Sequence, residues 1–63
     1  MIDKNDYFRS LKQTLDNGYT TKEDLHDVLN FEPTKNRAAI DFRSHIAEGL
    51  IDRNEAMEFV GGL

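Results

Sequence analysis

Residues 18–25 read Gly-Tyr-Thr-Thr-Lys-Glu-Asp-Leu, and 31 positions later residues 49–56 read Gly-Leu-Ile-Asp-Arg-Asn-Glu-Ala. Glycine readily takes the left-handed backbone conformation that ends many helices. Three residues after each glycine, Thr21 and Asp52 supply an oxygen that can cap the next helix. Each stretch therefore predicts a helix, a turn at the glycine and a second helix.

Apolar residues continue this correspondence on both sides of the two stretches. Their spacings of three and four residues place them on one face of a helix. Pro33 disfavours a helical conformation at the residue before it, so the chain is expected to break between the two halves. The corresponding pairs are Phe8 and Ala39, Leu11 and Phe42, Leu15 and Ile46, Val28 and Phe59, and Leu29 and Val60.

The sequence thus predicts an all-α fold, a small four-helix arrangement within a single domain spanning residues 1–63. Two tandem helix-Gly-turn-helix hairpins, at about residues 3–31 and 34–62, form a pseudo-twofold repeat. Gene duplication and convergence of two similar hairpins both account for the repeat. The structural roles at the turns and caps are assigned to Gly18, Thr21, Gly49 and Asp52.

A chain of 63 residues buries a small core and is expected to be marginally stable. It contains no cysteine for a disulfide, and its two histidines without thiolates do not suggest a structural zinc site. Self-association is the remaining way to add buried surface. We therefore expect a homodimer.

The charge balance of 8 Lys and Arg against 12 Asp and Glu gives a formal net charge of −4. Such a charge disfavours binding to a phosphate backbone, so nucleic acid is an improbable partner. The sequence has neither the apolar run of a signal peptide nor one long enough to cross a membrane. We expect a cytoplasmic protein without membrane contact.

No arrangement of residues predicts catalysis, a metal, a cofactor or a small-molecule substrate. The segment at residues 49–55 resembles the second half of a calcium-binding loop. The first, third and fifth ligand positions would then hold Ser44, Ile46 and Glu48, which supply few of the oxygen ligands that calcium needs. Asp41, His45 and Glu48 share a helix face, which is more typical of a solvated surface than of a metal or proton-transfer site. We therefore expect that the protein is not an enzyme.

A DNA-binding regulator of the helix-turn-helix kind is the alternative function. Residues 22–30 would form its first helix and residues 36–48 its recognition helix, with Lys35, Arg37 and Arg43 as the DNA-contacting residues. Asn36 stands where that motif needs a buried aliphatic residue, and the acidic charge balance also opposes it.

The favoured function is a small non-catalytic module for protein–protein interaction or regulation, which binds itself and another protein. Its partner-binding residues should be apolar side chains outside the predicted core faces. Tyr7, Ile40 and Met57 are the chosen candidates. Tyr19, Phe31 and Leu63 also lie at the margins of those faces, although turn packing accounts for Tyr19 and Phe31 at least equally well.

Overall fold

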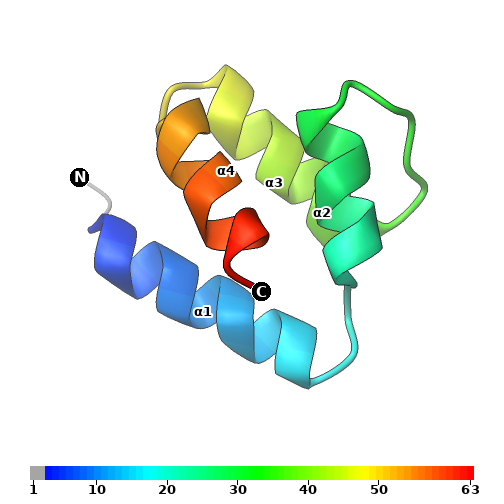
Figure 1. Ribbon diagram of the computed structural model, residues 1–63, viewed down its shortest axis with the longest axis horizontal. Coiled ribbons are helices and arrows are strands. Elements are labelled where there is room, and N and C mark those ends of the chain that lie inside the picture. Colours follow the sequence, from blue (N-terminus) through cyan, green and yellow to red (C-terminus); the bar gives the residue numbers. More distant parts are fainter. Residues whose placement is uncertain (1–2) are drawn as a thin grey trace.

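A computed structural model of the protein describes residues 3–63 and contains four α-helices in this range. In Figure 1 one helix runs along the lower edge, and the other three lie together above it. The described residues form no strand. The predicted all-α, four-helix class is therefore confirmed. The helices are α1 (Lys4–Asp16), α2 (Lys22–Leu29), α3 (Arg37–Ala47) and α4 (Arg53–Gly61).

A side-chain cap precedes each helix and explains where it begins. The hydroxyl of Thr21 accepts a hydrogen bond of 3.1 Å from the backbone N–H of Asp24, and a carboxylate oxygen of Asp52 accepts one of 3.3 Å from Glu55. Asp3 caps α1 and Asn36 caps α3 in the same way. These contacts satisfy N–H groups that have no partner within the helix.

Glycines in the left-handed conformation end α1 and α3. The φ angle is 80° at Gly18 and 77° at Gly49. The residue after each glycine donates its N–H back to the last helical turn, from Tyr19 to the carbonyl of Thr14 and from Leu50 to that of His45. Both turns are therefore Schellman motifs, in which a positive φ lets the chain leave the helix with its last carbonyls bonded.

Replacing either glycine with alanine should destabilise the fold by about 1 kcal/mol or more, because a Cβ is strained at positive φ. The space around Gly18 and Gly49 is open, so the loss would come from backbone conformation and not from a clash. Thermal unfolding of each variant measures the effect. Gly61→Ala is the matched control, because this helical glycine has open space and no positive φ. Unchanged melting temperatures in both turn variants would contradict the assignment.

The core draws on all four helices. The most extensive contacts between helices join α2 to α3 and α2 to α4. They therefore connect the first half of the chain with the second. On the other side, α1 reaches α4 through Phe8, whose ring stacks on Phe59 with centroids 4.9 Å apart. The two halves thus share one core. Its buried apolar residues are Leu11, Leu25, Val28, Leu29, Ala39, Phe42, Ile51, Ala56 and Val60.

Thr20 and Ile51 occupy matching places after the two turns, and both side chains are buried. The hydroxyl of Thr20 has no hydrogen-bond partner among the described residues. A buried polar group without a partner typically costs about 1–3 kcal/mol. Thr20 therefore stabilises the first half of the chain less than Ile51, the matching aliphatic residue, stabilises the second half.

Thr20→Val should raise the free energy of unfolding by about 1 kcal/mol, because valine keeps the shape and removes the unpaired hydroxyl. Urea denaturation of the two proteins side by side measures the difference. Thr34→Val, at a residue whose hydroxyl accepts from the backbone of Asn36, serves as the control and should not stabilise. A loss of stability in Thr20→Val would show that the hydroxyl has a partner.

Candidate functional site

The backbone has an unusual conformation at Phe31, just after the C-terminal end of α2. The φ angle of Phe31 is 59°, and no other non-glycine residue within 3–63 has a positive φ. The N–H of Glu32 donates to the carbonyl of Asp27 at 2.7 Å, so this turn is the Schellman type found after α1 and α3. Here, however, a phenylalanine occupies the place of the glycine. The left-handed conformation costs such a residue about 1–2 kcal/mol.

The ring of Phe31 gains little from the core in return, since 84% of the residue surface is exposed. It is instead held from one side by Arg53, the first residue of α4. The Arg53 guanidinium carbon lies 4.4 Å from the centre of the ring, and the same group donates a hydrogen bond to the carbonyl of Leu29. Arg53 therefore closes the end of α2 and positions the exposed ring.

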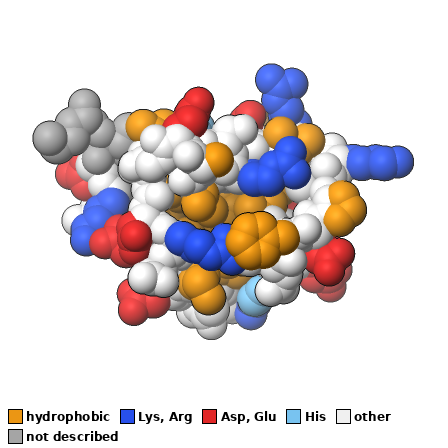
Figure 2. Space-filling model, turned by 90° about the horizontal axis from the view of Figure 1, so that it is seen from above, with side chains coloured by type: hydrophobic (Ala, Val, Ile, Leu, Met, Phe, Trp, Pro, Cys, Tyr) orange, Lys and Arg blue, Asp and Glu red, His pale blue; other side chains and the backbone are white. Residues whose placement is uncertain are grey.

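Phe31 lines a groove of about 400 Å³ between the C-terminal ends of α2 and α3 and the start of α4. We name it the Phe31 groove. The ends of α2 and α3 lie at the top of Figure 1, and Figure 2 looks down on this side. It shows apolar side chains in a hollow with Lys and Arg side chains beside it. The lining residues are Val28, Phe31, Glu32, Pro33, Arg43, Ile46, Ala47 and Arg53.

The chemistry of this groove suits binding. Its apolar surface can take an apolar side chain, and its three charged residues, Glu32, Arg43 and Arg53, can pair with charges of a partner. No thiol, hydroxyl or imidazole is among its lining side chains. The groove therefore offers a place for an apolar anchor beside charged side chains.

The three partner-binding residues chosen from the sequence lie on three different helices. Tyr7 is partly buried, with its hydroxyl bonded to His45, and Ile40 is partly buried as well. Met57 is exposed at 48%. None of them lines the Phe31 groove. These three residues stay predicted partner contacts, and they lie outside the Phe31 groove.

The three candidate DNA-contacting residues are all exposed, but they do not face one way. Arg37 pairs with Asp41 at 3.5 Å, and Lys35 lies in the connection before α3. Arg43 lines the Phe31 groove. Each residue of a helix turns by about 100°, so the six residues from Arg37 to Arg43 turn by about 600°, which is about 120° short of two full turns. The two side chains therefore point about 120° apart around α3.

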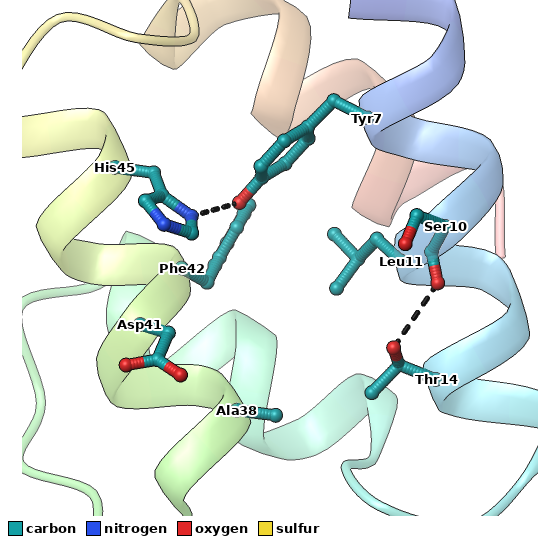
Figure 3. A pocket seen from close by; sticks show the side chains of 8 residues that line it. All are labelled: Tyr7, Ser10, Leu11, Thr14, Ala38, Asp41, Phe42 and His45. Carbon is teal, nitrogen blue, oxygen red and sulfur yellow. Dashed lines mark hydrogen bonds between the residues drawn. The ribbon is translucent and has the colours of Figure 1, made fainter.

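A smaller cavity of about 190 Å³ lies between α1 and α3 (Figure 3). Tyr7 extends from α1 towards α3, and its hydroxyl shares a hydrogen bond of 2.6 Å with Nδ1 of His45. Burial raises the pKa of Tyr7 to about 12, and the negative charge of Asp41 adds to the shift. The neutral phenol is therefore favoured here, and it joins α1 to α3.

This shift makes stability depend on pH in alkaline solution. The folded-state pKa of Tyr7 lies above its ordinary value of 10.0, so its contribution is complete below pH 10 and is lost as the pH rises towards 12. Wild type should exceed Tyr7→Phe in stability below pH 10, and the difference should shrink above it. Denaturant unfolding at a series of pH values measures this. A difference that stays constant across the range would contradict the buried phenol.

Two other expectations concern the membrane and the trio of Asp41, His45 and Glu48. Within residues 3–63, no three His, Cys, Asp or Glu side chains are grouped so that they could hold a metal ion. One ring nitrogen of His45, Nδ1, shares a hydrogen bond with Tyr7. Over the same residues, no helix combines the length and apolar character needed to span a bilayer.

Comparisons with protein-family models, with curated proteins and with solved structures find no match to this chain. These comparisons therefore assign no function to the Phe31 groove.

The sequence analysis places Phe31 among the apolar residues at the margins of the predicted core faces, but it favours other residues as partner contacts. The available signal was Pro33, because a proline often follows one or two residues after a helix end, and Phe31 stands two residues before it.

Proposed function

We propose that this protein is a small non-catalytic interaction module that binds a protein partner through the Phe31 groove. The observation that carries the proposal is Phe31 itself, which combines a strained backbone with an almost fully exposed ring. A residue of this kind lowers the stability of the free chain. Strain that the fold does not need is often found where a residue serves binding.

The surroundings of Phe31 support the same reading. Arg53 holds the ring by stacking, so the ring is already positioned and loses little freedom when a partner covers it. Aromatic and arginine side chains are the types that most often dominate binding energy at protein interfaces. The groove contains one aromatic ring and two arginines around an apolar surface.

The test is photocrosslinking from position 31 in the native host, with benzoylphenylalanine in place of Phe31. This residue keeps an aromatic ring at the same place. We expect adducts heavier than the chain itself after irradiation, with a protein identified by mass spectrometry. The same residue at Asn54, which is exposed on α4 and does not line the groove, is the control and should give no such adduct. Absence of adducts from position 31, or equal adducts from both positions, would overturn the proposal.

A further inference from the structure

The Phe31 groove carries a projection and a hollow on the same face. The projection is Phe31, a residue whose surface is 84% exposed. The hollow beside it is lined by apolar residues, among them Pro33 and Ile46. In a twofold dimer each surface patch meets its own copy, so a patch with both features can fill itself from the partner. Phe31 of each chain would then enter the hollow of the other.

The charges at the groove can also pair with their own copies across a twofold axis. Glu32 and Arg43 are both exposed and both line it. Neither forms an ion pair with another residue within 3–63. They carry opposite signs, so a twofold axis through the groove can place Glu32 of each copy against Arg43 of the other. Both charges remain available for such a contact.

The net charge also favours this face for self-contact. The whole chain carries −4, whereas the groove has two arginines and one glutamate. The groove is therefore slightly positive, and the excess negative charge lies elsewhere. Two copies that meet here bring one net positive charge against another but keep the larger negative charge of each chain apart.

The size of the chain limits how strong the contact can be. A stable interface typically buries about 800 Å² on each partner. The accessible surface of the described structure is 4429 Å², so such an interface would cover about a fifth of it. We expect a dimer in the micromolar range, which adds the buried surface that a small core lacks.

The geometry points to a second copy of this chain as the partner of the Phe31 groove, in a twofold dimer with each Phe31 seated in the other chain's hollow. Glu32 of one copy pairs with Arg43 of the other, twice in the dimer. This inference rests on the proposed function, because it names the occupant of the same groove.

The test is a charge exchange followed by sedimentation equilibrium of the purified full chain, from about 1 µM to 1 mM. Glu32→Lys places like charges opposite each other in its own dimer, and so does Arg43→Glu. Each variant alone should therefore associate at least about tenfold more weakly than wild type. In an equal mixture of the two, both pairs regain opposite charges. The mixture should recover association to within about threefold of wild type.

Asp6→Lys and Arg9→Glu on α1 are the matched controls, because they change the charge equally at exposed residues outside the groove. Each should leave association within about twofold of wild type. Circular dichroism of every variant verifies that it is folded. A wild type that stays monomeric, a control that matches the groove variants, or a mixture without recovery would overturn the dimer. The proposed function is judged separately, because crosslinking from position 31 to a different protein would support it even if the chain is monomeric.

Discussion

Phe42→Ala is expected to remove a large share of the free energy of unfolding at 25 °C. Phe42 is only 1% exposed and is the largest of the fully buried side chains. Truncating a buried phenylalanine typically costs about 3–5 kcal/mol, through lost burial and the cavity left behind. A chain of 63 residues has a total stability of about 3–9 kcal/mol. One side chain therefore accounts for a large share of the folding free energy.

Far-ultraviolet circular dichroism and urea denaturation measure this loss. Phe31→Ala is the matched control, because it makes the same chemical change at a residue that is 84% exposed. This variant should lose about 1 kcal/mol or less of the free energy of unfolding, because only the stacking of the ring with Arg53 is removed. Similar losses in the two variants would mean that Phe42 is not the centre of the core.

Replacing Phe31 should separate stability from association, and this is the second large effect. Phe31→Gly removes both the ring and the strain of the positive φ, whereas Phe31→Ala removes the ring alone. The glycine variant should therefore be about 1 kcal/mol more stable than the alanine variant. Both should lose self-association by at least about tenfold, because an aromatic side chain at an interface centre often dominates the binding energy.

Urea denaturation at a concentration where the chain is monomeric gives the stability order, and sedimentation equilibrium gives the association. Tyr19→Ala is the control for the loss of an exposed aromatic ring, since Tyr19 is 69% exposed and does not line the groove. It should associate as wild type does. If Phe31→Gly self-associates as strongly as wild type, Phe31 does not take part in the dimer contact. If Phe31→Ala is as stable as Phe31→Gly, the positive φ of Phe31 does not strain the backbone.

Local rules made most of the fold predictable. The two glycines, the hydroxyl of Thr21 and the carboxylate of Asp52 act within a few residues of themselves, so their spacing gave the helix ends. Packing is not local in this sense. The close contact of α2 with α3 and α4 depends on which apolar faces fit together, and the offset of 31 positions does not determine that.

The candidate site was less predictable, for the same reason. Phe31 takes a conformation that usually belongs to glycine, and its ring is held by Arg53, which comes 22 residues later in the chain. Tyr7 was chosen as an exposed residue from its place at the edge of a helix face. In the structure its hydroxyl finds His45 on another helix, a contact that spans 38 residues. Neither pairing can be derived from helical periodicity.

The most direct test of the Phe31 groove is a nuclear magnetic resonance dilution series on the nitrogen-labelled chain. We expect the amide signals that shift with concentration to come from residues 28–32 and 43–47 and from Arg53. Signals from Asp6 and Arg9, on the exposed side of α1, should stay constant. Shifts that map to the surface around Met57, or a spectrum that does not change at any concentration, would contradict the groove as the surface through which this chain binds itself.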